Sequence, residues 1–243
     1  MSVHGWYGSR IPPARRAPKR SPRVLDLIGH VAPARTAQVL CIGAHCDDIE
    51  IGCGGALQAL QARRPKLRIN WVVLSGTPER RLETQRAMEL LVRPRQRGLL
   101  SIGDFADGLF PAQYGAIKQF FESLKRLPRP DLIFCHERAD RHQDHRIVNE
   151  MVWNTFRDQL VLEYEIPKWD GGLGEPNLYV PLSAAHLKTK VDALMKAHAS
   201  QRRRDWFTPD TFKALARLRG VECRAADGFA EAFHARKVLF GGL

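Results

Sequence analysis

The chain has 243 residues, of which 44% are hydrophobic and 26% are charged, which is enough for one globular domain with a substantial core. The composition excludes a bilayer-spanning protein, because no apolar run approaches the roughly 18 residues that a spanning helix needs. The formal net charge of +12 favours acidic partners, such as phosphorylated substrates, anionic lipid surfaces or nucleic acid.

Much of this charge lies near the N-terminus, where the stretch PPARRAPKRSPR mixes basic residues with prolines. Such a composition is typical of a tail that does not join a folded core. We therefore expect a basic, proline-rich tail over residues 1–30 and a single catalytic domain over residues 31–243.

Five cysteines are present, an odd number, and none forms a CxxC pair. This usage favours reduced thiols over a disulfide framework, and therefore a cytoplasmic location. The basic tail adds the expectation of a peripheral contact with an anionic substrate or membrane surface. The sequence leaves a homo-oligomer open and indicates no obligate nucleic acid.

From residue 37 onward, short apolar runs alternate with longer segments of helical periodicity. Buried strands are predicted at 37–45, 68–75, 98–105, 131–137, 160–167 and 178–183, and helices at 49–64, 79–92, 114–127, 145–159 and about 184–203. The segment GFAEAFHARKVLF near the end reads as a tail. Alternating strands and helices predict an α/β fold, Rossmann-like, with a mostly parallel sheet and helices on both faces.

Two polar clusters follow predicted strands, at points where ligands of open parallel sheets bind. The first is HCDD, residues 45–48, after the strand at 37–45. The second is HERADRHQDH, residues 136–145, after the strand at 131–137. Because the carboxyl ends of parallel strands meet at one edge of the sheet, the two clusters are expected to face a common crevice.

The residue types in these clusters suit a divalent metal. His45 and Asp48 are three positions apart at a strand-to-helix turn, and His142 and His145 have the same spacing at the start of a helix. Two imidazoles and one carboxylate form a hydrolytic zinc set with an open position for water, and the same set accepts ferrous iron. Asp47 is then a spare carboxylate beside the metal that can take a proton from an attacking water.

Three of these features also have ordinary structural interpretations. Asp48 could cap the helix that follows it. Cys46 and Cys53 match no common zinc-finger spacing and are better explained as small packing residues. The glycines in GCGG form neither GxGxxG nor a Walker motif, so close packing of the helix against the sheet explains them better than phosphate binding.

Together the clusters resemble the PIG-L/LmbE-like family of zinc-dependent de-N-acetylases. AHCDDIEIGCGG is similar to the family's first signature, A-H-P-D-D followed by G-x-G-G, and HQDH is similar to its H-x-D-H signature. Weaker similarities are SGTPERRLETQRAMELL, which resembles a Thr/Gly loop with an R-x-x-E helix, and the segments HASQ and FAEAF. The resemblance covers roughly residues 37–240.

The resemblance implies His45, Asp48 and His145 as zinc ligands and Asp47 as the general base that later protonates the departing amine. It implies that His142 stabilises the oxyanion and is itself oriented by Asp144. Arg86, in an R-x-x-E stretch, is implied more weakly as a substrate contact.

One position departs from the family pattern, because Cys46 stands where the signature usually has proline. Proline would stiffen the turn, and cysteine does so less well. Since the expected ligands on both sides are present, we interpret the change as a tolerated variation.

The expected activity is metal-dependent removal of the N-acetyl group from an amino sugar of the N-acetylglucosamine type. Its carrier could be a glycoconjugate, a nucleotide, a lipid or a natural-product intermediate. One alternative is an amidase that acts on a different acyl amide. A second, of another class, is a basic module that binds nucleic acid or an anionic membrane.

Overall fold

The computed structural model describes residues 36–167 and 169–238. Its seven strands form one sheet in the order β3-β2-β1-β4-β5-β7-β6. The strands are β1 (Ala37–His45), β2 (Leu67–Ser75), β3 (Arg97–Ile102), β4 (Leu132–His136), β5 (Leu160–Tyr164), β6 (Leu178–Leu182) and β7 (Phe229–His234). The tail expected over residues 1–30 lies outside the described residues.

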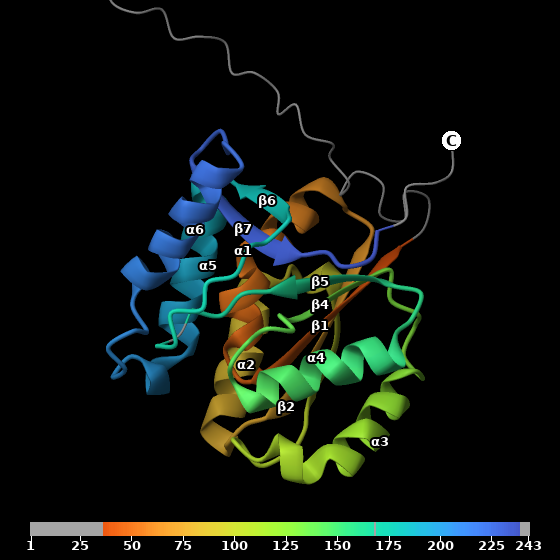
Figure 1. Ribbon diagram of the computed structural model, residues 1–243. Coiled ribbons are helices and arrows are strands. Elements are labelled where there is room, and N and C mark those ends of the chain that lie inside the picture. Colours follow the sequence, from red (N-terminus) through yellow and green to blue (C-terminus); the bar gives the residue numbers. More distant parts are fainter. Residues whose placement is uncertain (1–35, 168, 239–243) are drawn as a thin grey trace, which may run out of the picture.

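Six α-helices connect or cover these strands in the described part of the chain (Figure 1). They are α1 (Asp48–Arg63), α2 (Pro78–Leu91), α3 (Tyr114–Leu124), α4 (Gln143–Thr155), α5 (Ala184–Ala197) and α6 (Pro209–Glu222). Short 3₁₀ turns lie at Pro94–Gln96, Phe110–Gln113 and Ala199–Gln201.

The first five strands are all parallel, which confirms the predicted fold class. β1 is the middle one of these five strands and pairs with β2 on one side and with β4 on the other. The chain therefore reverses its winding direction between β1 and β4, which is the position where doubly wound sheets bind their ligands. Both polar clusters identified in the sequence follow these two strands.

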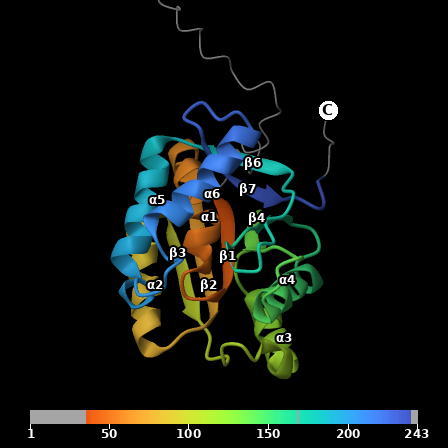
Figure 2. The ribbon, with the colours of Figure 1, turned by 60° about the vertical axis from the view of Figure 1, so that its left-hand side comes forward.

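The helices cover both faces of the sheet (Figure 2). α3 and α4 pack together on one face, whereas α1, α2 and α5 contact one another on the other. One apolar cluster includes Leu57 on α1 and Trp71 on β2, and a second joins Ile117 on α3 and Val148 on α4 to the opposite face of the sheet. These two cores hold the carboxyl ends of β1 and β4 rigidly between the layers.

The C-terminal third departs from the prediction. The helix expected from Ala184 to about Arg203 ends at Ala197, and the separate helix α6 follows. The sequence did carry a start signal for α6, because the Thr208 hydroxyl accepts a hydrogen bond from the Thr211 amide and Pro209 occupies the first turn.

The segment GFAEAF, expected to be a tail, supplies strand β7. This strand lies between β5 and β6 and is antiparallel to both. The sheet is therefore mixed at this edge, and only the part from β3 to β5 is purely parallel. An alternating pattern of six residues is too short to distinguish such a strand from an extended tail.

The glycine cluster of α1 serves close packing, as expected. A Cβ atom at Gly52 would collide with the ring of Tyr164 on β5. The Tyr164 hydroxyl donates a hydrogen bond of 2.7 Å to the carbonyl of Ile42 on β1. The bare backbone at Gly52 thus lets α1 lie against the sheet immediately behind the first polar cluster.

Two helical glycines provide a matched test of packing. A Cβ at Gly220 on α6 would lie 2.5 Å from the backbone nitrogen of Phe229 and closer still to the carbonyl of Gly228, and backbone atoms cannot rotate away. At Gly115 on α3, a Cβ would meet nothing within 4 Å. We expect Gly220→Ala to lower the free energy of unfolding by about 1–3 kcal/mol and Gly115→Ala to raise it by about 0.5 kcal/mol. Urea denaturation of both variants measures the two changes, and equal effects would contradict the packing described.

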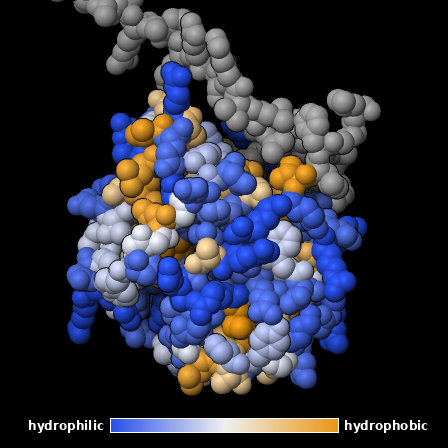
Figure 3. Space-filling model, viewed as in Figure 1, coloured by the Kyte–Doolittle hydropathy of each residue, from blue (hydrophilic) through white to orange (hydrophobic). Residues whose placement is uncertain are grey.

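The surface seen in Figure 3 is mostly hydrophilic, with apolar residues in small separate groups. None of the described helices combines the length and apolar composition needed to cross a bilayer.

Candidate metal centre

The first cluster forms the turn between β1 and α1. His45 is the last residue of β1, and its amide donates a 2.7 Å hydrogen bond to Oδ2 of Asp48. Between them, Asp47 has φ 132° and ψ −21°, a conformation that non-glycine residues rarely adopt. Such strain persists only where surrounding contacts fix it, and it occurs most often at functional sites.

Asp47 and Asp48 contact different partners, although they are adjacent and both buried. Asp47 Oδ1 lies 2.9 Å from the guanidinium of Arg80 on α2. Asp48 Oδ2 lies 3.5 Å from Nδ1 of His45 and 3.1 Å from Nε2 of His136. Each carboxylate therefore has its own cationic or hydrogen-bonding partner, which offsets the repulsion between the two.

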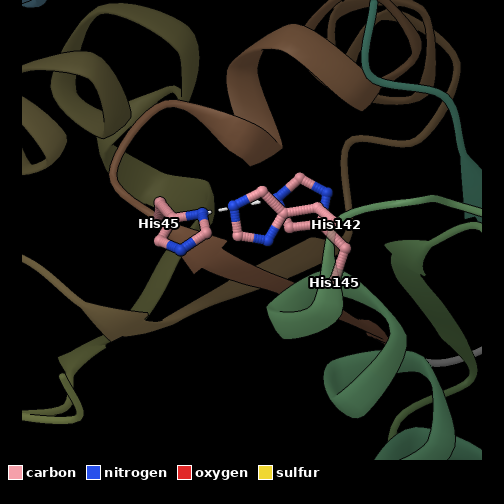
Figure 4. A group of neighbouring side chains, drawn as sticks. All are labelled: His45, His142 and His145. Atoms are coloured by element: carbon pink, nitrogen blue, oxygen red, sulfur yellow. Dashed lines mark hydrogen bonds between the residues drawn. The ribbon is translucent and has the colours of Figure 1, made fainter. Parts of the chain in front are cut away.

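The second cluster places two imidazoles at the start of α4 (Figure 4). His142 is the N-cap of this helix, and its Nδ1 accepts a 3.2 Å hydrogen bond from the Asp144 amide. His145 follows within the first turn and is buried, with its ring stacked on that of His142 at a centroid separation of 4.5 Å. Both rings face His45, which comes from the end of β1.

The structure brings the three predicted metal ligands to one point. Nε2 of His145 lies 3.3 Å from Nδ1 of His45 and 3.6 Å from Oδ1 of Asp48, and Nδ1 of His45 lies 3.5 Å from Oδ2 of Asp48. In a tetrahedral zinc site with ligand bonds of about 2.0–2.2 Å, the ligand atoms lie roughly 3.3–3.6 Å apart. The two histidines approach different oxygens of Asp48, so the three side chains are neighbours whose donor types suit a divalent metal.

Two further histidines reach the same centre. His142 forms a potential ligand group with His45 and His145, and His136 forms another with Asp48 and His145. His136 ends β4, is fully buried, and stacks on His145 at 3.7 Å between ring centroids. The sequence interpretation gave His136 no role. Its position near the carboxyl end of the strand predicted at 131–137 is the signal that could have identified it.

Each predicted histidine ligand is oriented by a carboxylate. Asp140 Oδ2 lies 2.8 Å from Nδ1 of His145, which leaves Nε2 of that ring directed at the centre. Asp144 Oδ2 lies 3.1 Å from Nε2 of His45, and its two oxygens also accept hydrogen bonds from the amides of Gly108 and Phe110. Such outer partners fix the tautomer and raise the basicity of a ligand.

The role of Asp144 differs from the one that the family resemblance implied. Its carboxylate was expected to orient His142, but it contacts His45 and touches His142 only through its backbone amide. Asp140, which the prediction omitted, orients His145 instead. The reason is local: in the first turn of α4 the Asp144 side chain faces the loop that carries Gly108 and Phe110, across the ring of His45.

Asp140 offers a direct test of this arrangement. We expect Asp140→Asn to lower the affinity for the metal by about 10–100-fold, because the neutral amide no longer supports the Nδ1 proton of His145. Competition with a chelator of known affinity measures the change. The same substitution at Asp158, which is exposed and pairs only distantly with Arg129, is the control and should leave metal affinity unchanged.

An arginine also lies at the centre, but it is Arg80 and not Arg86. Both residues begin an R-x-x-E stretch on α2, and the sequence analysis proposed Arg86, in the second stretch, as a substrate contact. Arg80 lies in the first helical turn, near the carboxyl edge of the sheet, and contacts both Asp47 and the carbonyl of Cys46. Arg86 is six residues further, a rotation of about 240°, and its side chain is exposed.

Two of the weaker sequence similarities, HASQ and the first R-x-x-E stretch, also lie near this edge. Nε2 of His198 lies 2.9 Å from Oε1 of Glu50 in the first turn of α1. The amide and hydroxyl of Ser200 donate to the two oxygens of Glu83, the acidic residue of the first R-x-x-E stretch. The segment HASQ therefore links the first turn of α1 to the second turn of α2, next to Asp47 and Arg80.

Burial sets the protonation behaviour of the carboxylates. It raises the pKa of Asp47 to about 6, in spite of the opposing charge of Arg80. Burial acts on Asp48 in the same direction, but His145 and His136 outweigh it and hold the pKa of Asp48 well below its usual range. The two adjacent carboxylates thus have pKa shifts in opposite directions, and the raised pKa of Asp47 suits a group that accepts and returns a proton.

Cys46 behaves as a packing residue. It is fully buried, and its thiol donates to the carbonyl of Ser75 at 3.4 Å. Burial raises its pKa to about 11, so the thiolate that would bind a metal or react is suppressed. All five cysteines are free thiols.

Fold and site together define a class: a doubly wound α/β protein with a histidine–aspartate cluster that could hold a metal ion, at the carboxyl edge of two adjacent parallel strands. A family model described as PIG-L, GlcNAc-PI de-N-acetylase, matches residues 40–156. The Escherichia coli (strain K12) protein YaiS, described as an uncharacterized deacetylase, is 29% identical over 188 residues, which cover 72% of this chain and 97% of YaiS. Both matches confirm the predicted resemblance to the PIG-L/LmbE-like family of deacetylases.

Solved structures share the fold at lower identity. The N,N′-diacetylchitobiose deacetylase from Pyrococcus horikoshii is 19% identical, with a TM-score of 0.62 over 81% of this chain and 82% of its own. GalB from Pseudomonas putida KT2440, a 4-carboxy-2-hydroxymuconate hydratase, is 17% identical, with a TM-score of 0.67 over 85% of this chain and 99% of GalB. Because a deacetylase and a hydratase share this fold, the reaction must be argued from the site.

Proposed function

We propose that the protein is a metal-dependent hydrolase that removes the N-acetyl group from an N-acetylated amino sugar. The observation that carries this proposal is the clustering of His45, Asp48 and His145, whose nearest donor atoms lie 3.3–3.6 Å apart pair by pair, with the buried carboxylate of Asp47 beside them. The family model and the relative YaiS support the same reaction class.

Zn²⁺ suits this donor set, and Fe²⁺ accepts the same two histidines and one carboxylate. When bound, the cation polarises the acetyl carbonyl and lowers the pKa of water toward roughly 7. His45, Asp48 and His145 would hold it, with Asp144 and Asp140 fixing the two rings.

Asp47 is the proposed general base and acid. An amide is a poor electrophile with a poor leaving group, so hydrolysis needs a proton removed from water and a proton delivered to the amine. The Asp47 carboxylate accepts the water proton during attack on the acetyl carbonyl and then transfers it to the nitrogen of the sugar as the C–N bond breaks. Arg80, at 2.9 Å, holds this carboxylate in place.

His142 is the proposed donor to the oxyanion. Its Nδ1 accepts the Asp144 amide proton, so the proton of the neutral ring resides on Nε2. Burial lowers the pKa of His142, with a further contribution from His45, which favours this neutral form. A fixed N–H directed at the reacting carbonyl stabilises the developing negative charge.

The substrate class rests on the family description and on charge. The family model is described as a GlcNAc-PI de-N-acetylase, and the Pyrococcus horikoshii enzyme as an N,N′-diacetylchitobiose deacetylase. The net charge of +12 favours an anionic carrier, such as a nucleotide, a phosphoinositol or a lipid phosphate. We propose Arg80 rather than Arg86 as the arginine nearest the substrate, because Arg80 contacts the proposed base.

The proposal is tested by metal analysis of the purified protein together with an assay for acetate and free amine. The panel should contain N-acetylhexosamine compounds that are free, nucleotide-linked or lipid-linked. We expect one bound divalent metal per chain and equimolar acetate and amine from at least one substrate. A chain that binds no divalent metal, or one that releases no acetate from any member, would refute the function.

The alternatives give other outcomes. Release of an acid other than acetate would indicate an amidase with a different acyl preference. A binding module driven by the basic tail would lose salt-dependent affinity for nucleic acid or anionic vesicles when residues 1–25 are deleted, whereas a deacetylase would keep its turnover. The cytoplasmic location, the membrane contact and a homo-oligomer stay predictions.

A further inference from the structure

The ring of His45 has polar groups on both of its nitrogens. Nδ1 faces Asp48 and His145 in the proposed metal centre. Nε2 lies 3.1 Å from Oδ2 of Asp144 and also 3.1 Å from Oδ1 of Asp107, a residue in the loop after β3. The two nitrogens thus mark two neighbouring sites on opposite sides of one imidazole.

On the Nε2 side of His45, two carboxylates share one hydrogen-bond donor. One N–H group donates fully to only one acceptor, and Asp144 is buried and further fixed by the amides of Gly108 and Phe110. Asp107 is therefore a surplus carboxylate, and its side chain is 63% exposed. Two carboxylates this close repel one another unless a cation lies between them.

His142 completes the group. Its Nδ1 accepts the Asp144 amide, which leaves Nε2 available. One donor atom from each of His45, Asp107, His142 and Asp144 lies within 4.8 Å of the others. Two carboxylates and an imidazole with access to solvent form a ligand set for Zn²⁺ or Mn²⁺, with open positions for water.

We propose that Asp107, His142 and Asp144 form a second divalent-cation site beside Nε2 of His45. The inference rests on the proposed function, in which the first cation occupies His45, Asp48 and His145. The second site is weaker, because Asp107 is exposed and the other two side chains already make hydrogen bonds. It fills only when the metal is in excess over the chain.

Filling this site has a consequence for turnover. Ligation of a cation by Nε2 of His142 replaces the N–H that would donate to the oxyanion. It also places a positive charge on the side of His45 that faces the exposed Asp107. Excess Zn²⁺ should therefore inhibit the enzyme without removing the first cation.

Zinc titration of the metal-free protein tests the inference, with bound metal measured after equilibrium dialysis. The wild-type chain should bind one equivalent tightly and a second at higher free zinc, and Asp107→Asn should bind only the first. Asp104→Asn is the matched control, because Asp104 lies in the same loop, is exposed and pairs with Arg81. It should retain both equivalents.

Inhibition by zinc is the second readout. For each variant, turnover is expressed relative to its own activity with one equivalent of zinc. The zinc concentration that halves this turnover should be at least about tenfold higher in Asp107→Asn than in the wild type, and unchanged in Asp104→Asn. Saturation of the wild type at one equivalent, or equal behaviour of both variants, overturns the second site. Binding of no equivalent at all overturns the proposed function instead.

Discussion

Replacing Asp47 with asparagine should lower kcat by about 100-fold or more while the bound metal stays in place. Asparagine has nearly the same size, so it can occupy the strained turn at φ 132°, but it cannot accept a proton from water or return one to the amine. A 100-fold loss corresponds to about 2.7 kcal/mol of transition-state stabilisation. Steady-state kinetics and metal analysis of the same preparation measure both quantities.

A substitution at the adjacent Asp48 is the control for this result. Asp48→Ala removes a proposed ligand, so the variant should lose the metal and the activity together. If Asp47→Asn retained full turnover, Asp47 would not be the base. If it lost the metal as Asp48→Ala does, Asp47 would be a ligand and the assignment of the two carboxylates would be reversed.

The turn at Asp47 explains how one dipeptide supplies two functions. Asp47 is the N-cap of α1 and lies outside the regular helix, which begins at Asp48. The unusual backbone at Asp47 separates the carboxylates, so that Asp48 contacts His45 and His136 and Asp47 contacts Arg80. Proline in place of Cys46 would stiffen this turn, but here the buried thiol and the Arg80 contact with its carbonyl hold it.

The sequence predicted the parallel half of the fold because its signals are local. Each strand from β1 to β5 is a short apolar run, and each following helix has its own periodicity. The edge where the site lies follows from parallel pairing alone. Strand β7 could not be predicted in this way, because its place between β5 and β6 depends on pairing with residues far away in the chain.

The sequence indicated which residue types lie at the site better than it indicated which residues contact one another there. His45, Asp48 and His145 converge as their spacing indicated. Arg80 was missed because α2 contains two R-x-x-E stretches, and only the start of the helix at Pro78 shows which of them faces the site. The contact between Asp144 and His45 was missed because it depends on the loop that carries Gly108, for which the sequence has no local signal.

Alanine at His145 and at His142 should separate metal binding from catalysis, although the two rings stack on each other within one turn of α4. His145→Ala removes Nε2 from the point where it meets His45 and Asp48, so bound metal should fall from about one equivalent to near zero and turnover should fall to background. His142→Ala leaves those three side chains intact. It should keep the first metal and lower kcat by about 10²–10³-fold, as expected for loss of one oxyanion donor.

The KM of His142→Ala shows whether His142 acts on the oxyanion or on substrate binding. A group that acts only on the oxyanion should change kcat with little effect on KM, because the charge develops after the substrate has bound. Metal content, kcat and KM of both variants are measured on protein whose circular dichroism spectrum matches the wild type. If His142→Ala lost the metal and His145→Ala kept it, the ligand would be His142 of the three-histidine group, and His145 would be left as the candidate donor to the oxyanion.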